Sequence, residues 1–133
     1  MNKLPRLVLA RKVFFSSAIS YFCLEQGKER NQCRPRRPQG YGYNFVLEIR
    51  VQGRRDPVTG LVVNLSDLDK NLQALVKTLD HHHLAFEVEA FKNKVPSLEN
   101  VAEYCFTELK KKLGSQLAGV RLSQGNDDWL DIN

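Results

Sequence analysis

The segment YNFVLEIRVQG, at residues 43–53, constrains the fold more than any other part of the sequence. Large apolar side chains occupy every second position of it: Tyr43, Phe45, Leu47, Ile49 and Val51. Successive side chains of a β-strand point to opposite faces, so this period of two predicts a strand with one strongly apolar face. That face needs a second layer of the protein to cover it.

Further strands are predicted on both sides of this segment. Residues 7–18 are rich in β-branched and aromatic side chains, which favours a strand. Residues 61–65 are expected to continue the second strand briefly. Near the end of the chain, residues 118–124 and 128–132 flank a Gly125–Asn126 turn, which is typical of a hairpin.

Two helices are predicted between the two pairs of strands. The first follows Ser66 and ends at Asp80, and its apolar residues have helical spacing. These residues are Leu68, Leu72, Leu75, Val76 and Leu79. The second helix has Ser97 as its predicted N-cap, and Asn100 forms a partial capping box with it. Gly114 is expected to end this helix.

The order of elements predicts an α+β fold. Two strands, two helices and two more strands indicate a four-stranded antiparallel sheet with both helices on one face. The length of 133 residues predicts one domain over residues 1–133. Such a sheet has two open edges, and self-association can cover exposed edges, so we expect a homo-oligomer.

The composition favours a cytoplasmic protein. The chain is 42% hydrophobic and 26% charged, and its sequence has no apolar run near the ~18 residues of a membrane span. The apolar stretch near the N-terminus is interrupted by Arg11 and Lys12, which is unlike a signal peptide. Three cysteines without a CxxC pair predict free thiols.

A cluster of basic residues precedes the second strand. It contains Lys28, Arg30, Arg34, Arg36 and Arg37. The cluster is open to two interpretations, a solvated loop or a site for a phosphate-bearing small molecule. Nucleic acid is not the predicted partner, because no aromatic side chains alternate with the arginines as a stacking surface requires.

Five segments in order resemble the 6-pyruvoyl-tetrahydropterin synthases and their 6-carboxy-tetrahydropterin synthase relatives. They are FSSAI at 15–19, Cys33 with GYGYNF at 40–45, DPVTGLVVNLSDL at 56–68, LDHHHL at 79–84 and PSLENVAEY at 96–104. The resemblance implies the tunnelling fold, in which subunits join edge to edge into a barrel. It implies a trimer, or a hexamer of two stacked rings, with active sites between subunits that bind a dihydropterin triphosphate.

The metal site of this family is not matched. The family holds a zinc ion with three histidines, and those positions fall here on Ile19, Tyr41 and Tyr43. Zinc requires imidazole, thiolate or carboxylate donors, which these side chains do not supply. We therefore expect no zinc and no other cofactor. The consecutive histidines 81–83 are not a predicted metal site either, because an extended backbone turns neighbouring side chains in different directions.

The proton-transfer residues of the family are partly kept, since Cys33 lies two residues further from the glycine-rich segment than the cysteine of the family does. The resemblance implies that Cys33 acts as a base and that Asp80 and His81 assist proton transfer. The arginines beside Cys33 would lower the pKa of its thiol, and a carboxylate beside an imidazole suits proton transfer. The alternatives remain open that Cys33 is a surface thiol without a role and that Asp80 and His81 only end a helix.

The pterin-binding residues of the family are partly matched. The glutamate with which the family anchors the pterin ring corresponds here to Gln124, a neutral amide that makes a weaker contact. Other predicted ligand-binding residues are Ser97 and Glu99 at the start of the second helix, Tyr41 and Tyr43, and Arg34, Arg36 and Arg37 for phosphates. Trp129 and Asp128 are expected to be packing and turn residues.

These features predict a divergent member of the family that binds a dihydropterin without zinc and retains acid/base chemistry. One alternative is a catalytically inactive relative that acts as a binding or scaffolding subunit. The other is the full synthase reaction, elimination of triphosphate, by an altered site. That reaction draws on a metal to stabilise developing negative charge, so the loss of three ligands disfavours it.

Overall fold

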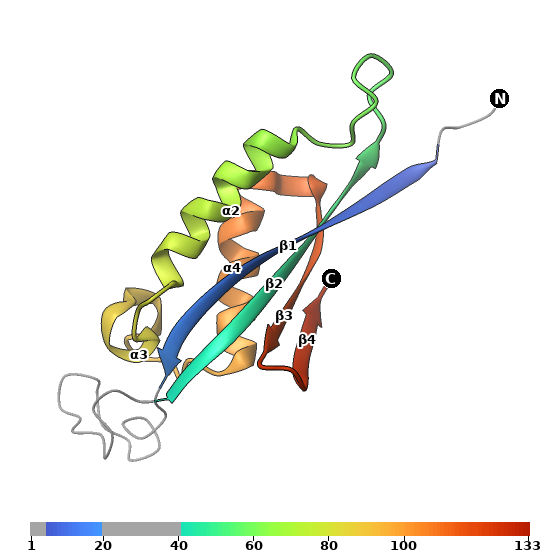
Figure 1. Ribbon diagram of the computed structural model, residues 1–133. Coiled ribbons are helices and arrows are strands. Elements are labelled where there is room, and N and C mark those ends of the chain that lie inside the picture. The colour runs from blue at the N-terminus through green and yellow to red at the C-terminus, as the bar shows by residue number, and fades with distance from the viewer. Residues whose placement is uncertain (1–4, 20–40) are drawn as a thin grey trace.

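The computed structural model describes residues 5–19 and 41–133. Within these residues a four-stranded antiparallel sheet has the order β1–β2–β3–β4 and carries two long helices on one face (Figure 1). The strands are β1 (Arg6–Ile19), β2 (Tyr41–Arg54), β3 (Leu117–Gln124) and β4 (Asp128–Ile132). The predicted α+β architecture is confirmed.

The two long helices are α2 (Leu65–Leu79) and α4 (Leu98–Leu113). Three short helical segments join the main elements: α3 (Leu84–Glu87), η2 (Glu89–Phe91) and η3 (Gly114–Gln116). They were not predicted, because three or four residues are too few to show a helical period. In the part of the chain that is described, no helix is long and apolar enough to cross a membrane.

The core lies between the sheet and the two helices. The alternating pattern of β2 is realised, since Phe45, Leu47, Ile49 and Val51 are at most 1% exposed. They belong to one apolar cluster with the predicted stripe of α2 and with the buried residues of α4, which are Val101, Ala102, Cys105 and Leu109. The two helices cover this face of β2, so the ends of both helices lie beside the ends of the strands.

The first helix begins earlier than predicted. Asn64, rather than Ser66, is the N-cap of α2, because its side chain accepts hydrogen bonds from the backbone N–H groups of Ser66 and Asp67. The N-cap residue and the bend before it occupy most of residues 61–65, so the predicted strand there is wrong. The predicted end of α2 at Asp80 is confirmed.

The second helix begins and ends as predicted. The Ser97 side chain accepts a hydrogen bond of 3.1 Å from the backbone N–H of Asn100, and Gly114 follows the helix with a positive φ of 58°. The second hydrogen bond of a capping box, from the backbone N–H of Ser97 to the side chain of Asn100, is absent at this described helix start. The Asn100 side chain instead donates to the carbonyl of Val95, at 2.7 Å.

The histidines at 81–83 form a tight turn against β1 rather than an extended loop. The backbone N–H of His81 donates to the carbonyl of Ser16, at 2.7 Å, and that of Ala18 donates to the carbonyl of His82, at 3.0 Å. His83 then pairs with Ala18 in a short parallel bridge. These contacts bring the three histidines to the end of β1, beside the start of β2.

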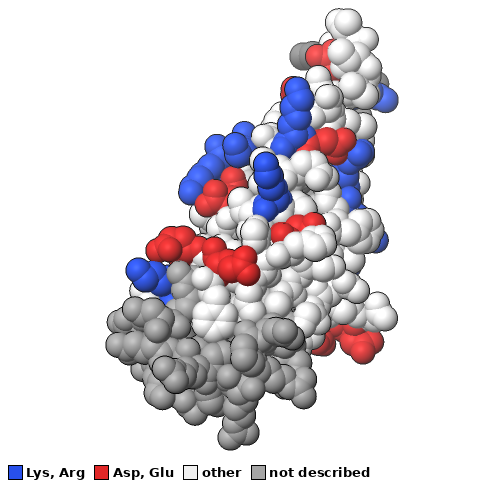
Figure 2. Space-filling model, turned by 60° about the vertical axis from the view of Figure 1, so that its left-hand side comes forward, with Lys and Arg blue, Asp and Glu red and all other residues white. Residues whose placement is uncertain are grey.

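The other face of the sheet is not covered by the described helices (Figure 1). On the side of the molecule in Figure 2, Lys and Arg side chains are interspersed with Asp and Glu side chains. Ion pairs join some of the described elements, such as that of Arg11 with Asp69, which joins β1 to α2 at 2.8 Å. The described part of this side therefore has no single sign of charge.

Candidate functional site

Two pockets lie at the same end of the sheet, where β1 and β3 end and β2 and β4 begin (Figure 1). The hairpin pocket, of about 530 Å³, is lined by Ser97, Leu98, Glu99, Gln124, Asp127, Asp128, Trp129 and Leu130. The histidine pocket, of about 600 Å³, is lined by Ser16, Ser17, Ala18, Gly42, Tyr43, Asn44, His81, His82, His83 and Glu87. Both contain residues that the sequence analysis selected.

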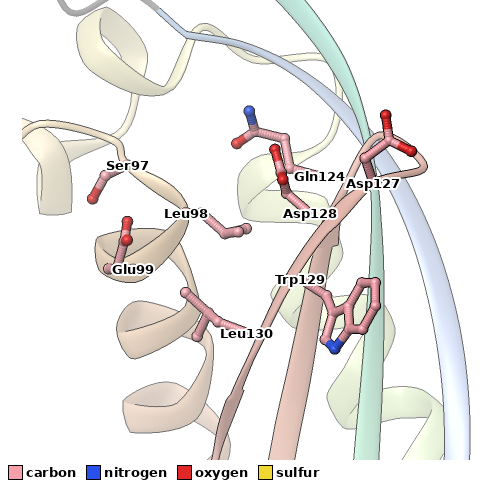
Figure 3. A pocket seen from close by; sticks show the side chains of 8 residues that line it. All are labelled: Ser97, Leu98, Glu99, Gln124, Asp127, Asp128, Trp129 and Leu130. Carbon is pink, nitrogen blue, oxygen red and sulfur yellow. The ribbon is translucent and has the colours of Figure 1, made fainter.

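The hairpin pocket is built from the start of α4 and the β3–β4 hairpin. Ser97, the N-cap, and Glu99, in the first turn of α4, line the side of the helix start, and the Leu98 side chain points from there toward the strands (Figure 3). Gln124 and Asp128 lie on the opposite wall, at the base of the hairpin (Figure 3). Gly125 allows the turn with a φ of 67° and donates its N–H to the carbonyl of Asn44. The structure therefore brings together the predicted residues Ser97, Glu99 and Gln124.

Hydrogen-bond acceptors dominate the polar lining of the hairpin pocket. The side-chain oxygen of Gln124 is buried and has no hydrogen-bond partner among the described residues. Leaving a buried acceptor unpaired costs about 1–3 kcal/mol, so a partner from outside the chain would be stabilising. Glu99, Asp127 and Asp128 add carboxylates, which accept hydrogen bonds when ionised. This arrangement suits a ligand that presents several N–H donors.

Two residues of the hairpin pocket were assigned other roles by the sequence. Trp129, expected to pack in the core, is 56% exposed, and its ring lies 5.7 Å from the guanidinium carbon of Arg121. Asp128, expected in the turn, is the first residue of β4 and pairs with Gln124. Asp127 was not among the predicted ligand-binding residues, although it lies close to Gln124 in the sequence.

Asp80 and His81 form a hydrogen-bonded pair at the rim of the histidine pocket. His81 Nδ1 lies 2.9 Å from one Asp80 carboxylate oxygen, and the backbone N–H of Ser16 donates to the other at 2.8 Å. The pKa of Asp80 is lowered, chiefly by the hydrogen bond from Ser16 and further by that from His81. An ionised Asp80 fixes the proton on Nδ1, which leaves Nε2 of a neutral His81 free to accept a proton.

The backbone conformation of His81 presents its ring to solvent. Among the described residues other than glycine, only His81 has a positive φ, of 60°. This conformation is uncommon for a side-chain-bearing residue, and such residues gather at functional sites. The His81 side chain is 83% exposed, so its ring is open to a ligand.

The other two histidines have contrasting surroundings. His82 Nδ1 lies 2.9 Å from a Glu87 carboxylate oxygen, and the hydrogen bond from His82 is the main cause of the lowered pKa of Glu87. His83 is only 8% exposed, and neither of its ring nitrogens has a hydrogen-bond partner in the described chain. Burial lowers the pKa of His83. The sequence analysis missed both residues as individual contributors to the pocket.

Comparison with known proteins agrees with this geometry. The sequence model of 6-pyruvoyl tetrahydropterin synthase matches residues 9–133. The chain belongs to the 6-pyruvoyl tetrahydropterin synthase family. It is 34% identical to the human 6-pyruvoyl tetrahydrobiopterin synthase over 111 residues, which are 79% of this chain and 75% of the human protein.

Two further relatives extend the comparison. The structure of the Caenorhabditis elegans 6-pyruvoyl tetrahydropterin synthase superposes with a TM-score of 0.83 and 28% identity, covering 100% of this chain and 99% of that one. The chain thus has the tunnelling fold. The dihydroneopterin monophosphate aldolase of Pyrococcus furiosus is 30% identical over 97 residues, 69% of this chain and 76% of the aldolase. Related sequences therefore carry names for different reactions.

The described residues at the positions to which the resemblance assigns the zinc ligands do not fit a zinc ion. Ile19 is fully buried in the apolar core and has no atom that could bind a metal. The ring of Tyr43 packs edge-on against Phe45, with 6.4 Å between centroids. Tyr41 pairs with Ile19 through the backbone. Across residues 5–19 and 41–133, no three His, Cys, Asp or Glu side chains are grouped to hold a metal ion.

Several predicted residues of the family site lie outside the described residues. These are Cys33, Arg34, Arg36 and Arg37, and the side chain of Tyr41 is likewise not described. Cys105 is described, and burial raises the pKa of its thiol to about 12. Cys105 is therefore a core residue and not a nucleophile at neutral pH.

Proposed function

We propose that this protein binds a dihydropterin at the end of the sheet where the two pockets open, without the zinc ion of its family. The observation that carries the proposal is the hairpin pocket, which is lined by Ser97 and Glu99 at the start of α4 and by Gln124 at the end of β3. The ring of a pterin presents an amino group and ring N–H groups along one edge. The carboxylate of Glu99 and the unpaired amide oxygen of Gln124 are acceptors that match those donors.

Acid/base chemistry is assigned to the Asp80–His81 pair. His81 Nε2 accepts a proton from the side chain of the ligand, and the ionised Asp80 stabilises the resulting imidazolium. This role is supported by the 2.9 Å contact between the two side chains and by the exposure of the His81 ring. Cys33, at the position of the base in the family, is proposed as the second proton-transfer group.

The absence of zinc is part of the proposal. It is supported by Ile19, because a metal-binding side chain at this position would replace a fully buried apolar residue of the core. A site without a metal lacks a strong stabiliser of developing negative charge, so proton transfer is more readily sustained than the elimination of triphosphate. The arginines Arg34, Arg36 and Arg37 are proposed to bind ligand phosphates through charge.

Ligand binding is tested first. We expect 7,8-dihydroneopterin to raise the melting temperature of the purified protein and to bind with a measurable Kd. Gln124→Ala should weaken binding about five- to tenfold, because one buried hydrogen bond of about 1 kcal/mol is lost. Gln73→Ala is the matched control, since Gln73 is an exposed residue of α2 outside both pockets. Equal effects of the two substitutions would contradict the assigned pocket.

Turnover separates the proposal from its alternatives. The protein is incubated with 7,8-dihydroneopterin triphosphate, with added zinc or with a chelator, and triphosphate release and pterin products are followed. Zinc-independent conversion that disappears in His81→Ala supports the proposal. Binding of the triphosphate without any conversion would favour the inactive binding subunit. Conversion that requires zinc would favour the synthase reaction and contradict the metal-free site.

A further inference from the structure

His83 occupies a fixed position in the wall of the histidine pocket. Its backbone pairs with Ala18 of β1, and its backbone N–H donates to a Glu87 carboxylate oxygen at 3.2 Å. Its carbonyl accepts from the N–H groups of Phe86 and Glu87, at 3.2 and 2.8 Å. Its ring rests on that of Phe86, with 4.5 Å between centroids. Backbone and ring contacts together hold the imidazole in one place.

The imidazole of His83 is buried without hydrogen bonds. The side chain is 8% exposed, and both ring nitrogens are inaccessible and unpartnered among the described residues. Burial also favours the neutral ring, which has one N–H donor and one acceptor nitrogen. Each unpaired group costs about 1–3 kcal/mol, so an apolar side chain of similar size would be the better core residue.

Three other polar side chains that line the pocket are engaged within the chain. Ser17 donates its hydroxyl to the carbonyl of Leu79, at 2.6 Å. Ser16 donates to the Asn44 side chain, at 2.7 Å. His82 is bonded to Glu87. Among the three histidines of the pocket, only the His83 ring has no hydrogen-bond partner in the described chain, and a ligand that bonds it must displace the side chains that cover its nitrogens.

We propose that His83 binds a hydroxyl group on the side chain of the ligand. A hydroxyl is both donor and acceptor, which matches a neutral imidazole, and either ring nitrogen can make the contact. The assignment rests on the proposed function, in which the ligand is a dihydropterin whose side chain meets the Asp80–His81 pair. His83 lies two residues from His81 and lines the same pocket, so the bound hydroxyl would lie close to the proton acceptor.

The proposal predicts discrimination between two probes. One is 7,8-dihydroneopterin, which has a hydroxylated side chain, and the other is 6-methyl-7,8-dihydropterin, which has none. Both present the same ring to the hairpin pocket. The wild-type protein should bind the hydroxylated probe about tenfold more tightly, because a site built to bond a hydroxyl disfavours the analogue that lacks it. His83→Leu should remove this difference and leave the Kd of the methyl probe unchanged.

Two more variants separate binding from folding. His83→Asn retains one donor and one acceptor on a shorter side chain, so it should keep part of the discrimination. Gln73→Ala is the control, because Gln73 is exposed on α2 and outside both pockets, and it should leave the Kd ratio of the two probes unchanged. The melting temperature of unliganded His83→Leu should equal or exceed that of the wild type, since two unpaired polar atoms are removed.

The outcomes distinguish this proposal from the one on which it rests. If the wild-type protein binds both probes equally, His83 does not bind a hydroxyl, while pterin binding stands. If it binds neither probe, both proposals are overturned. A lower melting temperature in both His83 variants, with an unchanged Kd ratio, would identify His83 as a structural residue and overturn the inference alone.

Discussion

Asp80 links the end of α2, the end of β1 and the proposed proton acceptor. It follows the last residue of α2, accepts a hydrogen bond from the Ser16 backbone and contacts His81 Nδ1. The carboxylate is thus both a structural connection and an orienting group for the imidazole. Function and stability should respond together when it is removed.

Asp80→Ala should lower the free energy of unfolding by about 1–2 kcal/mol at neutral pH, because Ser16 and His81 lose a charged acceptor on a partly exposed residue. The folded-state pKa of Asp80 lies below its unfolded value of about 3.9, so its contribution is fully present above that pH. It is lost as the pH falls through the lower, folded-state pKa. Urea unfolding of both proteins between pH 3 and pH 7 measures this.

The control for this prediction is Asp80→Asn. Its amide oxygen can still accept from the Ser16 N–H, so most of the stability should return. The negative charge that orients and stabilises His81 is lost, so turnover should fall even where stability does not. A stability difference between wild type and Asp80→Ala that grows as the pH falls below 4 would contradict the assigned pKa direction.

The resemblance of ordered segments to the family was sufficient to select several candidate residues from the sequence. Asp80, His81, Ser97 and Glu99 were chosen from the ordered segments and Gln124 from its place in the last hairpin, and the structure puts them in or beside two pockets at one end of the sheet. His83 could not be chosen, because its importance lies in being buried without partners. That property depends on contacts with β1 and Phe86, so no local sequence pattern indicates it.

At the scale of elements, helix starts show the limit of local rules most clearly. Asn64 and Ser66 are both good N-cap residues, and both precede acidic or apolar residues of the helical pattern. The choice depends on which residue has an extended backbone and whose side chain reaches the free N–H groups. In the structure that residue is Asn64, with ψ of 110°, and Ser66 is already inside α2.

Asn64→Ala should therefore destabilise the protein by about 1 kcal/mol, the usual effect of removing an N-cap side chain. Ser66→Ala is the matched control and should change the free energy of unfolding by less than about 0.5 kcal/mol, because Ser66 is exposed and supplies only its backbone N–H to the cap. Urea unfolding of the two variants decides between the structure and the sequence-based N-cap. The reverse order of effects would favour Ser66.

At the scale of the whole molecule, one row of side chains crosses the sheet face that the described helices leave uncovered. The strand registers place Phe14 opposite Val46, Val46 opposite Ser123, and Ser123 opposite Trp129. The row begins on edge strand β1 and ends on edge strand β4. Its two ends are aromatic, and they are 69% and 56% exposed. Exposed aromatic residues at both edges favour an arrangement in which edge strand β1 of one copy pairs with edge strand β4 of a second copy.

Head-to-tail pairing of this kind makes a closed ring if the rotation between copies closes, as the barrel implied by the family resemblance requires. We therefore expect light scattering to give a mass three or six times that of the chain. Phe14→Asp and Trp129→Asp should each shift the mass towards that of one chain, because a charge would be buried in the contact.

Val58→Asp is the control, since Val58 is 92% exposed in the turn after β2 and outside the row. A mass unchanged in both row variants would show that the copies meet elsewhere. If the ring also completes the ligand site, Phe14→Asp, which lies outside both pockets, should weaken binding of 7,8-dihydroneopterin in step with dissociation, whereas Val58→Asp should not.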